Sequence, residues 1–351
     1  MLFRSTRAAQ QLDEHWYHLR VQEGDLPGKH LLRMQLSAHA AVAPQAYSLD
    51  AASVKLSETP PPQPGTSDCT STMVAGGTMC WMSGDVSAAH AAGYKGQGTY
   101  VTFVDDFKSS NTFSGNWGDG TDLRTHGGWT SSETLWVAPG AAPNIRLQDF
   151  TDGSKLTFNT VGLDVVNASY GMIGMARFYY DGALDSYATE KSIIDAARNG
   201  EAVVSKAAGN DGIAVGGNVK GTTDYLANSL IGAQSVIFVG ALDFNGSVDN
   251  KAPMSYYSNY AGSNKDVQSH FLVVGVDYKA TDLAGTSFAA PIVAGYAAIL
   301  GSKFTTATET QVVNQLLNTA RTDTIFNYDV AIHGQGEASL DRALAPESIK
   351  P

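Results

Sequence analysis

The chain has 351 residues, of which 43% are hydrophobic and 16% are charged, which excludes an intrinsically disordered protein. Its formal net charge of −11 argues against nucleic acid as a partner, because neutralising phosphates requires clustered Lys and Arg. No apolar stretch has the length of a transmembrane helix, so we expect no insertion into a membrane.

The N-terminal region differs in character from the rest of the chain. Residues 1–58 contain only short, mixed apolar segments, and residues 60–64 (PPPQP) predict a stiff, extended linker. We therefore expect three parts: an N-terminal extension or pro-segment (1–58), a Pro-rich linker with a Cys-containing loop (59–83), and a main domain (84–351).

The two cysteines of the chain, Cys69 and Cys80, lie close together in a loop rich in Gly, Ser and Thr. Such a local, isolated pair predicts one disulfide, which would contribute about 2–4 kcal/mol, and the alternative is two unrelated reduced thiols. A disulfide indicates an oxidising compartment, so we expect a secreted, periplasmic or extracellular protein. The N-terminus itself has no apolar core of a signal peptide.

From residue 100 onward, apolar strand-like runs alternate with helical patterns. Continuous apolar strands between helices predict an α/β fold, a doubly wound and mostly parallel sheet with helices on both faces. Gly200 is expected to end a helix in a left-handed conformation. Strands are predicted at 100–104, 144–150, 164–169, 202–205, 235–239 and 271–274, and helices at 186–199, from Ser287 onward and at 309–320.

The segment Gly285-Thr286-Ser287 precedes an apolar run that extends from Phe288 to Leu300. This run is too short to span a bilayer and predicts a buried helix, with Ser287 at its N-terminus. Backbone N–H groups and the helix dipole favour negative charge at such a place. Ser287 is therefore either a nucleophile whose oxyanion its own N–H would hold, or an ordinary N-cap.

Three further polar residues accompany Ser287 in a fixed chain order. Asp105 ends the strand predicted at 100–104, and Asn210 follows the strand predicted at 202–205. Of the eight histidines, only His126 lies between Asp105 and Asn210. Because a serine nucleophile needs a base, and the base needs a group that orients it, these residues are candidates for one catalytic site.

The motifs around these residues resemble those of the subtilisin-like serine proteases, the subtilase family. Residues 285–291 match the family's Gly-Thr-Ser-x-Ala-x-Pro, residues 207–210 match Ala-Ala-Gly-Asn, and residues 167–171 match Asn-x-Ser-x-Gly. The resemblance covers roughly residues 84–345 and leaves residues 1–65 outside.

The resemblance implies a serine endopeptidase that works through an acyl-enzyme. Ser287 would attack the scissile carbonyl, His126 would transfer the proton, and Asp105 would orient His126. Asn210 is implied to hold the oxyanion together with the Ser287 N–H. An extended polypeptide substrate is expected beside two segments, Ser169, Tyr170 and Gly171 on one side and Ala207, Ala208 and Gly209 on the other.

The sequence departs from the family pattern around the acid and the base. Asp105 is followed by Asp106 where the family has Ser or Thr, which leaves Asp106 as an alternative acid. Of the longer family motif around His126 only Thr125 and His126 remain, and the following Gly pair, 127–128, predicts a weakened helix. The short span after His126 lacks the loop that often carries calcium in the family. We therefore assign no metal site and no certain cofactor, and calcium is left open as an alternative despite the shortened loop.

Three other functions fit parts of this pattern. One is a catalytically silent binding protein on the same fold, which the altered motifs around Asp105 and His126 suggest. A second is a sedolisin-like acid protease, against which His126 and Asn210 argue. The third is esterase or transamidase chemistry at the same three residues. Polypeptides are the expected partners under the main hypothesis, and the sequence predicts no particular oligomeric state.

Overall fold

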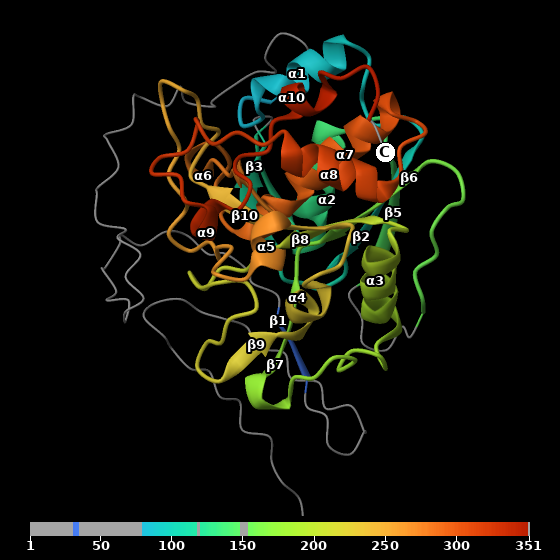
Figure 1. Cartoon of the computed structure of the whole chain (residues 1–351), viewed down its shortest axis with the longest axis vertical. Helices are drawn as coiled ribbons and strands as arrows, with labels where there is room; N and C mark the ends of the chain where they lie inside the picture. Colours follow the sequence, from blue (N-terminus) through green and yellow to red (C-terminus); the bar gives the residue numbers. More distant parts are fainter. Residues whose placement is uncertain (1–30, 35–78, 118–119, 148–153, 350–351) are drawn as a thin grey trace, which may run out of the picture.

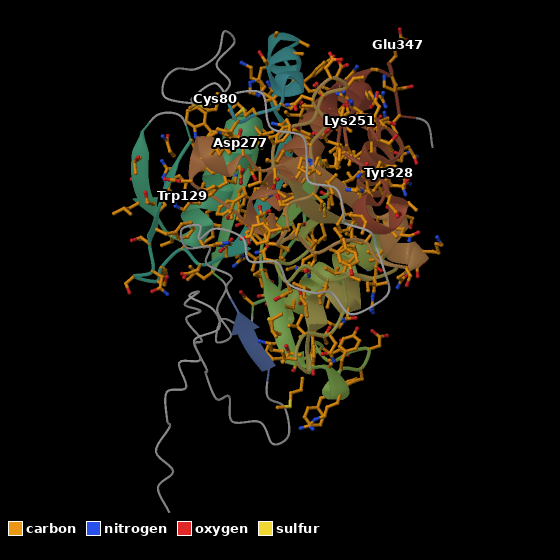
Figure 2. All side chains as sticks on the ribbon, turned by 90° about the vertical axis from the view of Figure 1, so that its left-hand side faces the viewer. Cys80, Trp129, Lys251, Asp277, Tyr328 and Glu347 are labelled. Carbon is orange, nitrogen blue, oxygen red and sulfur yellow. The ribbon has the colours of Figure 1, made fainter. Side chains whose placement is uncertain are left out.

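The computed structural model of the chain describes residues 31–34, 79–117, 120–147 and 154–349 (Figure 1). Residues 60–64 and Cys69 lie outside these ranges, whereas Cys80 lies within them (Figure 2). The Cys69–Cys80 disulfide and the predicted linker therefore stay predictions.

A six-stranded sheet forms the centre of the molecule, with the strand order β11-β10-β8-β6-β2-β5. Every pair of neighbouring strands in this sheet is parallel. All seven residues of β10 are buried, as expected for a strand that is covered on both faces. The strands are β2 (Thr99–Asp105), β5 (Ala142–Leu147), β6 (Leu163–Ala168), β8 (Val203–Ala207), β10 (Val236–Leu242) and β11 (Phe271–Gly275).

Helices cover both faces of this sheet, and each helix layer has its own apolar core (Figure 1). One layer holds α1 (Gly84–Ala91), α2 (His126–Val137), α7 (Ala290–Lys303), α8 (Glu309–Asn318) and α10 (Leu340–Leu344). The other holds α3 (Ala188–Asn199), α4 (Tyr225–Leu230) and α5 (Lys265–Ser269). The predicted doubly wound α/β fold is confirmed. Gly200 ends α3 with φ +73°, as its position in the sequence predicts.

The helix α7 lies at the centre of its layer and fixes the segment that carries Ser287. Gly295 lets α7 approach α2 closely, since a Cβ at this position would lie 2.6 Å from Val137 Cγ1. At the beginning of the helix, Ser205 Oγ donates to Ala290 O at 2.7 Å, and Thr134 Oγ1 donates to Pro291 O at 2.9 Å. The strand β8 and the helix α2 thus hold the same turn of α7 from two sides.

The structure corrects the predicted start of this helix. Ser287 lies in a separate 3-10 turn, η2 (Thr286–Phe288), and α7 begins only at Ala290. Gly285 precedes the turn with φ +134°, a conformation that favours glycine. Pro291 lies in the first turn of α7, where its fixed φ suits a helix start and its missing N–H costs nothing.

Two smaller antiparallel sheets flank the central one. The hairpin of β3 (Phe113–Asn116) and β4 (Thr121–Arg124) lies between β2 and α2 in the chain. The second sheet has the order β1-β7-β9. It joins β1 (Leu31–Met34) of the N-terminal region to β7 (Gly171–Met175) and β9 (Thr222–Asp224).

The remaining short elements lie in connecting segments. They are η1 (Ala176–Phe178), α6 (Tyr278–Thr281) and α9 (Val330–His333). None of the helices in the described part of the chain combines the length and the apolar character that crossing a membrane requires.

Candidate active site

Asp105 and His126 form a buried, hydrogen-bonded pair. Asp105 is the last residue of β2 and is 0% exposed, and His126 is the first residue of α2 and is 1% exposed. His126 Nδ1 lies 2.7 Å from Asp105 Oδ1, so the Nδ1–H donates to the carboxylate. With the proton on Nδ1, the lone pair of the neutral ring is on Nε2. Nε2 is buried and has no hydrogen-bond partner among the described residues.

Other groups hold the Asp105 carboxylate in place. The backbone N–H of Asp106 donates to Oδ1 at 2.7 Å, and Thr130 Oγ1 donates to Oδ2 at 3.0 Å. Thr130 lies four residues after His126 on α2, so one helix face carries both side-chain partners of Asp105. The side chain of Asp106 faces elsewhere, since its Oδ1 accepts from the backbone N–H groups of Lys108 and Ser109. Of the two adjacent carboxylates, Asp105 is the one that contacts His126.

The helix α2 forms despite the two glycines that follow His126. Thr125 caps it, because its Oγ1 accepts from Gly128 N at 3.2 Å. Gly127 N donates to Asp106 O at 2.9 Å, which ties the start of the helix to the end of β2. A Cβ at Gly127 would lie 2.8 Å from that same oxygen, so the close approach requires glycine.

Ser287 lies in η2 and is 3% exposed, and its side chain contacts the backbone of Ser169. Ser287 Oγ donates to Ser169 O at 3.2 Å, and Ser169 Oγ donates to Ser287 O at 3.0 Å. Ser287 is therefore not hydrogen-bonded to His126 in this structure. The residue after Ser287 does reach His126, since the rings of Phe288 and His126 lie 5.9 Å apart.

The side-chain amide of Asn210 is oriented by Thr286. Asn210 Oδ1 accepts from Thr286 N at 2.8 Å and from Thr286 Oγ1 at 3.0 Å. Thr286 Oγ1 in turn accepts from Gly209 N at 3.0 Å. Because Oδ1 is engaged with Thr286, the Nδ2 amide group of Asn210 is the end that stays available to a ligand.

Aromatic side chains surround the imidazole of His126. Phe113 of the β3–β4 hairpin lies 6.3 Å from it, and the rings of Phe113 and Phe288 lie 6.4 Å apart. Trp129 Nε1 donates to Phe113 O at 3.0 Å and so fixes the hairpin on α2 (Figure 2). The hairpin therefore covers His126 with apolar surface, which strengthens the electrostatic interactions of the pair.

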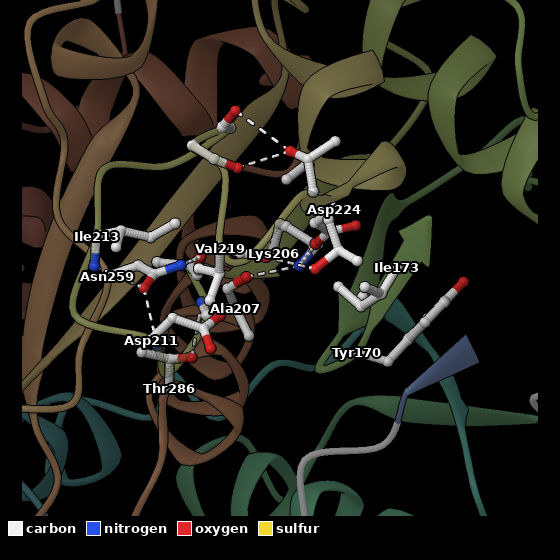
Figure 3. A pocket seen from close by; sticks show the side chains of 18 of the residues that line it. Tyr170, Ile173, Lys206, Ala207, Asp211, Ile213, Val219, Asp224, Asn259 and Thr286 are labelled. Atoms are coloured by element: carbon white, nitrogen blue, oxygen red, sulfur yellow. Dashed lines mark hydrogen bonds and ion pairs between the residues drawn. The ribbon is translucent and has the colours of Figure 1, made fainter. Parts of the chain in front are cut away.

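A cavity of about 120 Å³ opens beside Ser287, between the carboxyl ends of β6 and β8 (Figure 3). Both segments predicted to contact a substrate line it. The side chain of Tyr170 points away from it, with its OH donating to Glu190 at 3.1 Å (Figure 3). The predicted residues that line the cavity are Ser169, Tyr170, Gly171, Ala207, Ala208 and Gly209.

Charged residues that the motifs did not include also line this cavity. Lys206 Nζ lies 3.1 Å from Asp224 Oδ2, and their side chains are 2% and 18% exposed. Asp211 stands exposed at the cavity surface. The protein atoms packed around Asp211 and the negative charge of Asp224 raise the pKa of its carboxyl.

The roles of five residues of the site were not predicted from the sequence: Thr130, Thr286, Lys206, Asp211 and Asp224. Thr130 would follow from a helix that starts at His126, because it then lies one turn away on the same face. A lysine within the apolar run of β8 is a similar signal, since a buried lysine requires a partner. No such signal exists for Asp224, which reaches the cavity from a distant segment.

In the residues that the structure describes, no group of three or more His, Cys, Asp or Glu side chains is arranged to hold a metal ion.

Comparisons with known proteins found relatives in sequence and in structure. The model of the subtilase family matches residues 97–337. Subtilisin DY from Bacillus licheniformis is 29% identical over 262 residues, which are 66% of this chain and 86% of that protein. Among solved structures, a lanthipeptide protease has a TM-score of 0.50 at 18% identity, covering 74% of this chain and 91% of its own. The prenylagaramide maturation protease PagA has a TM-score of 0.48 at 18% identity, covering 74% and 96%.

Proposed function

This chain belongs to the subtilase family and is a serine-type peptidase, and on that premise we propose that it is an endopeptidase that cleaves polypeptides through an acyl-enzyme. The observation that carries the proposal is the Asp105–His126 pair. Its 2.7 Å hydrogen bond leaves a buried, unpartnered Nε2 beside the segment that holds Ser287.

In the proposed mechanism Ser287 is the nucleophile. Its Oγ leaves Ser169 O and turns toward His126 Nε2, a side-chain rotation that substrate binding favours. His126 takes the proton as Oγ attacks the carbonyl, and it later gives the proton to the leaving amine. Asp105 keeps the Nδ1 proton in place and stabilises the imidazolium. The long or absent Ser–His contact of an unliganded site is compatible with this role.

Asn210 Nδ2 and the backbone N–H of Ser287 are the proposed donors to the oxyanion. The orientation of the Asn210 amide supports this assignment, since Thr286 holds the oxygen end and leaves the donor end free. Such preorganised donors stabilise the charge that develops on the carbonyl oxygen without reorganising during the reaction.

The substrate is proposed to bind as an extended strand along residues 169–171 and 207–209. Support comes from β1, an extended segment from the N-terminal region that pairs antiparallel with β7, opposing Met34 to Gly171. The edge that follows Ser169 and Tyr170 is therefore able to accept a strand. Family membership further suggests that the protein acts outside the cytoplasm, and we include secretion in the proposal.

Labelling with a fluorophosphonate tests the nucleophile directly. The native full-length chain should be labelled, and Ser287→Ala and His126→Ala should not be, while all three chains keep the same circular dichroism spectrum. Casein hydrolysis should disappear in the same two variants. Equal, weak labelling of the native chain and of Ser287→Ala would refute the proposal and leave a silent binding protein as the remaining function.

A further inference from the structure

We propose that the cavity beside Ser287 selects a basic side chain, Lys or Arg, on the residue whose carbonyl Ser287 attacks. This inference rests on the proposed function and names its substrate class. The selecting groups are the carboxylates of Asp224 and Asp211, and Lys206 sets how strongly Asp224 acts.

The position of the cavity decides which substrate side chain enters it. Its walls are residues 169–171 and 207–209, which continue two adjacent parallel strands, β6 and β8. Ser287 stands at the cavity with its Oγ 3.2 Å from Ser169 O. A peptide that lies along these walls with one carbonyl at Ser287 Oγ points the side chain of that same residue into the space between them.

Gly171 keeps the path to Asp224 open. A Cβ at this position would lie only 2.9 Å from Asp224 Oδ2. The carboxylate therefore stands directly behind the backbone of the wall, where any side chain on residue 171 would cover it. A long substrate side chain that enters between the walls meets Asp224 inside the cavity (Figure 3).

The hydrogen bonds of Asp224 fix its carboxylate and leave it reachable. Oδ1 accepts from Met172 N at 2.9 Å and from Leu226 N at 3.0 Å, and Oδ2 faces Lys206 Nζ at 3.1 Å. The Asp224 side chain is 18% exposed, so Oδ2 can accept a further hydrogen bond from a substrate.

Lys206 is poorly placed to bind a substrate carboxylate. Its side chain is 2% exposed, and its ammonium already donates to Ala207 O at 2.6 Å and pairs with Asp224. The charges that a substrate reaches are thus two carboxylates, Asp224 and the exposed Asp211. The buried ammonium of Lys206 offsets one of these charges, so the cavity carries one negative charge in excess. A cationic side chain neutralises this excess, whereas an acidic side chain adds to it.

A matched peptide series measures the selection. The peptides differ only in the residue before the cleaved bond, which is Lys, Arg, Met or Glu. Met serves as the neutral counterpart of Lys because it is unbranched and of similar length. We expect kcat/KM for Lys and Arg to exceed that for Met by about tenfold, as for a partly solvated charge pair. The value for Glu should fall below that for Met.

Three variants assign the effect to residues through the Lys-to-Met ratio of kcat/KM. Asp211→Asn should lower the ratio, and Lys206→Met should raise it, because it removes the competing cation. Asp224→Asn alone would leave the buried charge of Lys206 without its carboxylate partner and destabilise the fold. The double variant Lys206→Met/Asp224→Asn avoids this problem, since Asn keeps an acceptor for the two backbone N–H groups. Its ratio should fall below that of Lys206→Met.

Fluorophosphonate labelling separates failure of this inference from failure of the proposed function. Labelled enzyme with equal kcat/KM for Lys and Met, or with Glu preferred, refutes the basic selectivity and leaves the peptidase function standing. A Lys preference that survives in both Asp211→Asn and the double variant refutes the assignment to these carboxylates. Absence of both labelling and cleavage refutes the proposed function, and this inference with it.

Discussion

The two sides of the candidate site are held by different kinds of contact. The Ser side, consisting of η2, Asn210 and the first turn of α7, is fixed largely through backbone groups. Thr286 N and Gly209 N both take part in the contacts that orient Asn210, and Ser205 Oγ binds Ala290 O. Such contacts require glycine and small polar residues at fixed places, so they leave a short, readable motif in the sequence.

The His side, consisting of Asp105, α2 and the β3–β4 hairpin, is fixed mainly through side chains. Thr130 holds the second oxygen of Asp105, and Phe113 and Trp129 hold the hairpin against His126. A side chain from another position can replace such a contact, so the local motif can change while the geometry of the pair is kept. A degraded motif on the His side is therefore weak evidence for a lost activity.

Replacing the carboxylate that contacts His126 should have the largest effect, and the adjacent Asp106 provides the control. Asp105→Asn should reduce kcat by roughly 10⁴, as is usual when the acid of such a triad is replaced by its amide. Asp106→Asn should change kcat by less than about tenfold, because the Asp106 carboxylate binds the turn at Lys108 and Ser109 and not His126. Steady-state hydrolysis of one chromogenic peptide measures both. An equal loss in the two variants would break the assignment of Asp105.

Removing the free donor on the Ser side should have the next largest effect. Asn210→Ala should lower kcat by about 10²–10³ with little change in KM, because the donor acts on charge that develops in the transition state. Thr286→Val should lower kcat less, by about tenfold, since it loosens the amide without removing it. Thr286→Ser keeps the hydroxyl and is the control. If Thr286→Ser loses as much as Thr286→Val, the methyl group matters and the hydrogen bond does not.

Much of the fold was predictable from sequence because its signals are local. Apolar runs such as 235–239 and 271–274 predict buried strands, and both are strands of the parallel sheet. Gly200 predicted the end of α3 from its position alone. The start of α7 was misplaced because a 3-10 turn and an α-helix have nearly the same apolar pattern over three residues. Only the backbone geometry after Gly285 separates them.

The candidate site was predictable where it depends on chain order, and not where it depends on packing. Asp105, His126, Asn210 and Ser287 follow one order along the chain, and the parallel sheet brings them to one edge. Asp224 reaches the cavity through β9, a short strand paired with β7. The residues around position 224 do not predict this contact, because it depends on the register between β7 and β9, which are distant in the chain.

Substitutions of Thr130 measure how much its hydrogen bond to Asp105 contributes to the His side. Thr130→Val should lower kcat by about tenfold and leave KM unchanged, because it removes the donor to Asp105 Oδ2 and keeps the shape of the side chain. Thr130→Ser should restore most of the loss. A rise in KM together with an unchanged kcat would show that Thr130 affects substrate binding instead, and it would weaken the contrast between the two sides.

The smallest expected effect on catalysis comes from a buried carboxylate outside both sides. Glu337 is 6% exposed, and burial raises the pKa of its carboxyl from 4.5 to about 7. Between pH 4.5 and about 7, Glu337 therefore keeps its proton in the folded chain and loses it in the unfolded chain. The contribution of Glu337 to stability should therefore fall as the pH rises from about 4.5 to 7 and level off above, by about 3 kcal/mol in all.

Glu337→Gln should remove this fall, because the amide oxygen still accepts from Gly246 N and carries no charge at any pH. Urea unfolding in a Ser287→Ala background, which prevents self-digestion, should give a free energy of unfolding that depends less on pH between 4.5 and 7 than that of the parent. The pH dependence of this difference should vanish well below pH 4.5, where Glu337 is protonated in most unfolded chains as well. If the free energies of unfolding of the parent and of Glu337→Gln change with pH in parallel over the whole range, Glu337 takes up no proton on folding. Water or a cation would then reach its carboxylate.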